Sequence, residues 1–209
     1  MRRSIRIAAL SLSLGWLSSM AQGPPALDTF TSPDGSFEFA YPESYALLVG
    51  ESILHATQGR NTVLPVCDFA TAVACVIYPI EGLAESRLEA AGFSVDKIVA
   101  AASENDCLTY ADQTARSRGT AAALTSVTLH ARRFQHATAT RKLTGHLQSA
   151  EFYRTFSRDK CYELQIAVSL ADDPASRKDS SAGSLGDPKA DNARESLRLI
   201  LSSTIFQKE

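Results

Sequence analysis

Residues 162–170 read Tyr-Glu-Leu-Gln-Ile-Ala-Val-Ser-Leu, which is the clearest strand pattern in this 209-residue sequence. Large apolar residues stand at every second position, and the residues between them are small or polar. Because successive side chains of a β-strand point to opposite faces of a sheet, this alternation predicts a strand with one apolar face. We expect that face to form part of the core through Tyr162, Leu164, Ile166, Val168 and Leu170.

The residues before this strand predict its hairpin partner. Residues 157–160 (Ser-Arg-Asp-Lys) have the composition of a turn. If the two central residues form the loop, Arg154 lies opposite Glu163 and Tyr153 lies opposite Leu164. The sequence therefore predicts both the hairpin and its register.

Other segments fit an antiparallel sheet covered by helices. Residues 37–41 alternate aromatic and smaller residues, which predicts a strand, and residues 45–49 can form a second strand. Residues 83–91 indicate a short helix that stops at Gly92. From Phe93 the pattern favours a short strand, and an amphipathic helix capped by Ser94 is the alternative. We expect an α+β fold with a sandwich-like antiparallel core.

The C-terminal region predicts an amphipathic helix. Asp187-Pro188 combines an N-cap acid with a proline at the first helical position. Residues 171–187 before it are polar and lack an apolar period, so we expect a loop there. The helix should cover the sheet with the stripe Ala190, Ala193, Leu197, Ile200 and Leu201.

The first residues have the pattern of a secretory signal. Three arginines among the first six residues precede the apolar run 7–17, and small residues follow at positions 19 and 21. We predict a signal peptide over 1–21, and one α+β domain over 22–209 that is secreted or periplasmic. No later stretch is apolar enough to predict a transmembrane helix.

Four cysteines fit an exported chain with two disulfides. Cys67 and Cys75 would face each other in a hairpin that turns about Thr71, which leaves Cys107 to pair with Cys161. A four-thiolate zinc site is the alternative, but the paired short spacings of such sites are missing.

Charge is distributed unevenly along the chain. The whole sequence has 21 basic and 23 acidic residues, which does not fit the strongly basic composition of a nucleic-acid-binding domain. Residues 127–168 are nevertheless net basic, and Arg132, Arg133, Arg141 and Lys142 could face an anionic ligand or surface. Ordinary surface charge is the alternative explanation.

Three histidines form the best candidate for a metal site. A hairpin that turns about Arg141 would place His136 opposite His146, with His130 on the same face as His136. Imidazoles in that arrangement could bind zinc or copper. Solvated or structural histidines are the alternative, because no carboxylate stands at ligand spacing nearby.

Short catalytic and cofactor-binding motifs are missing from the sequence. It contains no dinucleotide-binding glycine pattern, no phosphate-binding loop, no nucleophile elbow and no zinc-protease motif. We therefore expect no cofactor, and an enzyme is the less favoured interpretation.

Residues 32–45 read Ser-Pro-Asp-Gly-Ser-Phe-Glu-Phe-Ala-Tyr-Pro-Glu-Ser-Tyr. This stretch resembles the opening strand of PsbP-like proteins, in which a turn, an alternating aromatic strand and a Tyr-Pro pair follow one another. The late hairpin and the terminal helix are also similar to that fold. The resemblance implies an α+β sandwich used for binding or assembly.

The leading hypothesis is an exported, disulfide-stabilised and non-catalytic module that binds an unknown protein or small ligand. The alternative is a metal-binding protein or metal-dependent enzyme that uses His136 and His146. A third possibility is an envelope protein whose basic region meets an anionic surface.

Overall fold

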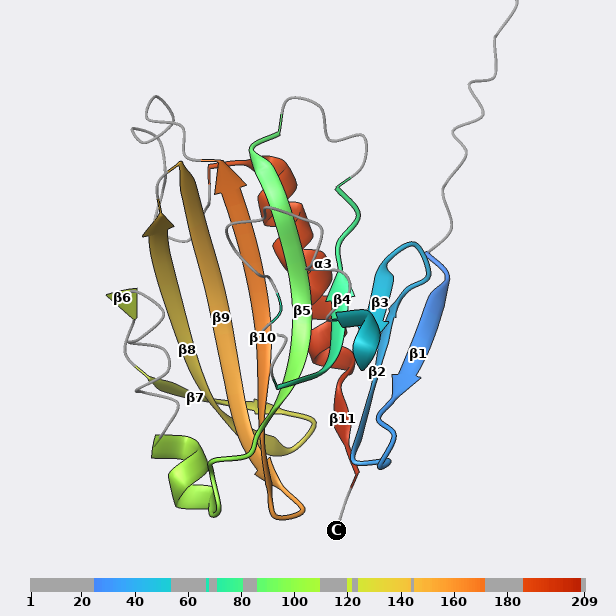
Figure 1. Cartoon of the computed structure of the whole chain (residues 1–209), viewed down its shortest axis with the longest axis vertical. Coiled ribbons are helices and arrows are strands. Elements are labelled where there is room, and N and C mark those ends of the chain that lie inside the picture. Colours follow the sequence, from blue (N-terminus) through green and yellow to red (C-terminus); the bar gives the residue numbers. More distant parts are fainter. Residues whose placement is uncertain are drawn as a thin grey trace, which may run out of the picture.

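The computed structural model describes residues 25–53, 67, 71–80, 86–109, 120–121, 124–143, 145–171 and 186–207. The described chain forms a three-stranded sheet, an eight-stranded sheet and a C-terminal helix (Figure 1). The small sheet has the order β1 (Leu27–Thr31), β2 (Phe37–Pro42), β11 (Ile205–Phe206). The large sheet has the order β3 (Ala46–Val49), β4 (Ala72–Ile77), β5 (Leu88–Ile98), β10 (Lys160–Ala171), β9 (His146–Ser157), β8 (Arg132–Leu143), β6 (Thr120–Ala121), and β7 (Thr125–Leu129) also pairs with β8.

The α+β class and the register of the late hairpin are confirmed. All strand pairs among the described residues are antiparallel. Arg154 lies opposite Glu163, and Tyr153 lies opposite Leu164. The loop residues Arg158 and Asp159 both have positive φ, as a two-residue hairpin turn demands.

The apolar face of β10 is the centre of the core. It packs against α3 (Pro188–Ser203) and against the aromatic face of β2, so the core lies between the large sheet on one side and the helix with the small sheet on the other (Figure 1). We call this side of the large sheet the inner face. Its β10 residues are almost fully buried: Tyr162, Leu164, Ile166, Val168 and Leu170.

Helix α3 begins where the sequence predicts. The Asp187 side chain accepts hydrogen bonds from the backbone N–H groups of Lys189 and Ala190, which would otherwise have no partner inside the helix. The same carboxylate accepts the backbone N–H of Arg87, so the cap also ties the helix to β5. The predicted apolar stripe is buried: Ala190, Ala193, Leu197, Ile200 and Leu201.

The opposite side of the large sheet, here called the outer face, carries both disulfides. Cys67 pairs with Cys75 and Cys107 pairs with Cys161, as predicted. Cys107 lies in a helical segment over 104–109, and this segment starts with a hydrogen bond from the backbone N–H of Asp106 to the Ser103 hydroxyl. Cys107 and Cys161 cluster with Ala101, Ile98 and Phe156 on this face.

A row of buried charges crosses the outer face. Asp96 of β5, Glu163 of β10 and Arg154 of β9 are neighbours in the strand register, and each is at most 2% exposed. Both Nε and Nη2 of Arg154 lie 2.6 Å from Oε2 of Glu163. Asp96 accepts hydrogen bonds from the hydroxyls of Thr71 and Ser94. The Arg154–Glu163 ion pair compensates the two opposite charges, as buried charges require. Nη1 of Arg154 and Oε1 of Glu163 are buried without a hydrogen bond to the described residues.

The helix predicted over 83–91 is wrong. Residues 88–91 are part of β5, which continues through Phe93 as the following strand prediction expected. β5 is central and has buried residues on both faces, so its apolar residues lose the alternation that marks a strand. Gly92 lies inside the strand between Ile77 and Ala167 and stops no helix.

Some predictions fall outside the described residues. These are the signal peptide over 1–21, the first strand of the Cys67 hairpin apart from Cys67 itself, and most of the polar loop over 171–187. Among the helices of the described chain, none has the length and apolarity needed to cross a membrane.

Candidate functional site

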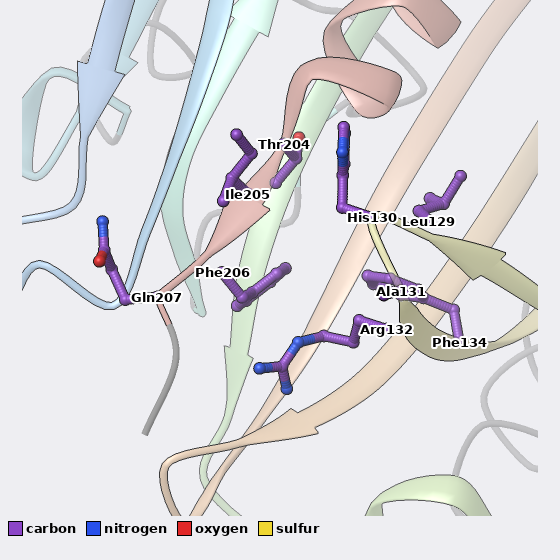
Figure 2. Close-up of a pocket in the computed structure, with 9 residues that line it drawn as sticks. All are labelled: Leu129, His130, Ala131, Arg132, Phe134, Thr204, Ile205, Phe206 and Gln207. Carbon is purple, nitrogen blue, oxygen red and sulfur yellow. The ribbon is translucent and has the colours of Figure 1, made fainter.

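A pocket of about 610 Å³ lies between β11 and the turn that joins β7 to β8 (Figure 2). One wall is the run 204–207, which contains β11, and the other is the run 129–132, which contains the turn. Phe134 forms part of the lining from β8. We call this hollow the β11 pocket. Its two walls come from regions about 70 residues apart in the chain, which the sheet packing brings together.

Aromatic rings form the floor of the β11 pocket. Phe134 is 1% exposed and Phe206 is 7% exposed, and their ring centroids are 6.1 Å apart. Phe206 also contacts Phe37 and Tyr162, with centroids at 5.7 Å and 5.2 Å. The floor is therefore fixed by the core and does not depend on a ligand for its shape.

Arg132 places a positive charge at the β11 pocket. Its guanidinium carbon lies 5.5 Å from the centroid of the Phe206 ring, within the range of a cation–π contact. One guanidinium nitrogen donates to the backbone carbonyl of Phe156 at 3.0 Å. Since a guanidinium has five N–H donors, this contact orients Arg132 and leaves further donors for a ligand.

The turn on the other wall has an unusual backbone. His130 and Ala131 have φ values of 49° and 63°, a region that non-glycine residues seldom adopt. The ring nitrogen Nε2 of His130 donates a hydrogen bond to the carbonyl of Ser202 in the last turn of α3. This bond connects the turn to the helix and holds the pocket wall in place.

A polar cluster lies beside α3 on the inner face, centred on Glu151. This buried carboxylate accepts hydrogen bonds from the Tyr153 hydroxyl at 2.8 Å and from Nη2 of Arg198 at 2.7 Å. Nε of Arg194 lies 3.7 Å from its Oε1 atom. Burial raises the pKa of Tyr153, and the neighbouring Glu151 charge adds to the shift. The phenol therefore stays protonated and serves as a hydrogen-bond donor.

His136 stacks on Tyr153 with ring centroids 4.5 Å apart. Burial lowers the pKa of His136, and Glu151 opposes that shift. Nδ1 is 3.2 Å from the Thr125 hydroxyl, while Nε2 is buried and has no hydrogen bond to the part of the chain that the structure describes. Within that part, no hydrogen bond joins His136 to a carboxylate, so these residues do not form a proton relay through the imidazole.

The prediction that His136 lies opposite His146 is wrong. The β8–β9 hairpin turns near Gly145, not at Arg141, so His136 lies opposite Tyr153 and His146 lies opposite Leu143. His136 and His146 are seven positions apart along the ladder, or roughly 24 Å at about 3.4 Å per residue. Instead, Nδ1 of His146 lies 2.7 Å from Oε2 of Glu89. Over the described residues, no three His, Cys, Asp or Glu side chains form a group that could hold a metal.

The four basic residues expected to face an anion lie at the two ends of β8. Arg132 lines the β11 pocket, and exposed Arg133 is 4.0 Å from Glu104. Arg141 and Lys142 are exposed near the far end of the strand. The four do not form one continuous patch, and Arg132 alone belongs to the pocket.

Sequence reasoning selected Arg132 and His130 but missed the other wall. Ile205 and Phe206 carry a signal that was available, because a β-branched and an aromatic residue directly after a helix favour a short strand. Nothing in the local sequence indicates that this strand borders a pocket. That property comes from its position opposite the β7–β8 turn.

No protein-family model matches the chain, and no curated protein matches it. Several solved structures are similar to it, and three of them are described here. A Bacteroides thetaiotaomicron protein is 11% identical over 87% of this chain and 48% of its own length, with a TM-score of 0.44. LpqN of Mycobacterium tuberculosis, involved in cell envelope biogenesis, is 10% identical over 87% of this chain and 91% of its own, with a TM-score of 0.48. Cyanobacterial PsbP from Synechocystis sp. PCC 6803 is 11% identical over 93% of this chain and 99% of its own, with a TM-score of 0.43.

A PsbP structure thus stands among the similar structures. The chain spans about half the length of the Bacteroides protein. The likeness concerns the fold and assigns no function.

Proposed function

We propose that this protein is an exported, non-catalytic binding protein and that the β11 pocket is its ligand site. The observation that carries the proposal is the joining of a rigid aromatic floor, Phe134 and Phe206, with the guanidinium of Arg132 in one hollow. A volume of about 610 Å³ and an apolar lining with a few polar groups are typical of ligand sites. This chemistry suits a ligand with an apolar part and an anionic group.

Two further features support the export part of the proposal. Residues 1–21 have the pattern of a secretory signal, and all four cysteines are paired in disulfides. Disulfides persist mainly in oxidising compartments. The intact mass of protein recovered outside the cytoplasm tests this part. We expect a chain that starts at Gln22 and is four hydrogens lighter than its reduced form.

A titration with 1-anilinonaphthalene-8-sulfonate tests the binding site, because this probe combines apolar rings with an anionic group. We expect saturable one-to-one binding that shifts the amide resonance of Phe206. Arg132→Met should weaken binding at least fivefold. Arg141→Met is the matched control because it removes the same charge from the far end of β8, and it should leave the affinity unchanged.

Equal loss of affinity in both arginine variants would point to a general charge effect and would overturn the assignment of the site. Binding that leaves the Phe206 resonance unmoved would also place the probe elsewhere.

A further inference from the structure

The β11 pocket borders an open strand edge. Within the described residues, β11 pairs on one side only, with β2. The pocket lies along its other side and is lined by four consecutive residues of this segment, 204–207. An exposed edge of this kind offers main-chain hydrogen-bonding groups to an added strand.

The pairing of β11 with β2 fixes which main-chain groups face the pocket side. The backbone N–H of Gln207 donates to the carbonyl of Ser36 at 3.0 Å, so the main-chain groups of Gln207 face β2. In an antiparallel pair, neighbouring residues direct their N–H and C=O groups to opposite sides. The N–H and C=O of Phe206 therefore point away from β2, along the edge that borders the pocket.

The side chains around that edge indicate what an added strand would carry. Phe206 lies opposite Phe37 and points to the inner face, where Phe134 and Arg132 lie beside it. A residue paired with Phe206 would direct its own side chain to the same face. That residue, and every second residue of the added strand on either side of it, would thus meet an aromatic floor and a guanidinium. This surface favours apolar and acidic side chains.

We infer that the β11 pocket binds an extended peptide segment, which adds to the open edge of β11 through the main chain of Phe206 and places apolar and acidic side chains, two residues apart, against the aromatic floor and Arg132. This inference rests on the proposed function and names its ligand class. Strand addition is a general mode of peptide recognition in which main-chain bonds supply affinity and alternate side chains supply specificity. Charge complementarity with Arg132 selects an acidic over a basic segment.

A heptapeptide, acetyl-Thr-Val-Thr-Glu-Thr-Val-Thr-amide, is the probe. Its valines and glutamate occupy the second, fourth and sixth positions, so their N–H groups would all face β11. The N–H groups of the threonines at the third and fifth positions would face the other way. N-methylation of the valines and the glutamate should weaken binding at least tenfold. N-methylation of the third and fifth residues is the matched control and should change the affinity less than threefold.

Isothermal titration and the Phe206 amide resonance report the result. We expect saturable binding, slowed hydrogen exchange at the Phe206 amide, and at least fivefold weaker binding when lysine replaces the peptide glutamate. Arg132→Met should remove this preference, whereas Arg141→Met should keep it. Equal sensitivity to both N-methylation patterns would overturn strand addition.

The aromatic sulfonate separates failure of this inference from failure of the proposed function. If the sulfonate binds at the β11 pocket and the peptide does not bind at millimolar concentration, the pocket is a small-molecule site and the peptide inference is wrong. If neither binds, both proposals are wrong.

Discussion

The inner face of β10 carries Tyr162, Leu164 and Ile166 beneath α3, whereas its outer face carries Cys161, Glu163 and Gln165. Both sets are buried and alternate along one strand. The inner set excludes water with large apolar side chains. The outer set relies on a disulfide and an ion pair. One strand can therefore combine two ways of being buried, and each has a different response to mutation.

The largest expected effect comes from the outer face. Arg154→Met removes the partner of buried Glu163 and leaves two carboxylates, Glu163 and Asp96, side by side. Breaking a buried ion pair typically lowers the free energy of unfolding by about 3–5 kcal/mol. Urea unfolding of the purified variant would measure this loss.

The double variant Arg154→Met, Glu163→Met is the control for that prediction. It removes both charges at similar volume, so we expect it to recover a large part of the lost stability. A single variant that loses less than about 1 kcal/mol would show that the ion pair is not needed on the outer face.

The two disulfides should differ in their contributions. In the chain-entropy model, a disulfide stabilises by restricting the unfolded chain, and longer loops give larger effects. Cys107 and Cys161 are 54 positions apart, and Cys67 and Cys75 are 8 apart. The model gives roughly 4 kcal/mol for the first and roughly 2.5 kcal/mol for the second.

Replacement of each cysteine pair by serine, followed by urea unfolding, checks this order. If the Cys67–Cys75 pair matters more, native-state packing rather than chain entropy controls the stability of the outer face.

How far the sequence predicted the fold differs between these two faces. The alternation of Tyr162, Leu164 and Ile166 identified the inner face, because residues buried on one side of a strand have a period of two. The same rule failed in β5, where burial on both sides removed the period and suggested a helix over 83–91. The Cys67–Cys75 disulfide was predicted because a hairpin would place both side chains on the same face. The Cys107–Cys161 disulfide was predicted because these two cysteines remained.

The candidate site was less accessible from the sequence. The histidine hypothesis depended on one turn position, and moving the turn from Arg141 to Gly145 separated His136 from His146. Gly145 has a φ of 80°, and glycine is the residue best suited to that conformation. The β11 pocket depends on contacts between 129–132 and 204–207, which no local pattern encodes.

A smaller effect is expected at the cap of α3, which covers the inner face. Asp187→Ala removes the acceptor for the N–H groups of Lys189 and Ala190 and for that of Arg87. Loss of an N-cap typically costs about 1 kcal/mol, with a range of about 0.5–2 kcal/mol. Thermal unfolding at neutral pH measures the change, and the exposed Glu195→Ala provides a control on the same helix.

The cap should also respond to acid. Burial would raise the pKa of Asp187, but the hydrogen bonds it accepts from Arg87, Ala190, Ser86 and Lys189 outweigh burial and lower the pKa. A carboxyl with a lowered folded-state pKa stabilises the protein above its unfolded pKa, near 3.8, and that contribution is lost as the pH falls below it. The stability gap between the wild type and Asp187→Ala should therefore narrow below about pH 4.

The smallest expected effect is a pH dependence at His136, on the inner face beside the Glu151 cluster. Burial lowers its folded-state pKa, with Glu151 opposing and Arg198 adding to the shift. The unfolded chain therefore binds a proton more readily than the folded chain once the pH falls below the ordinary value of 6.5. The stability that this group contributes is complete above that pH and decreases below it.

His136→Gln should remove this part of the stability loss between pH 7 and pH 5, measured by urea unfolding, while His146→Gln should leave it in place. A loss that persists in His136→Gln would mean that the burial of His136 is not its cause.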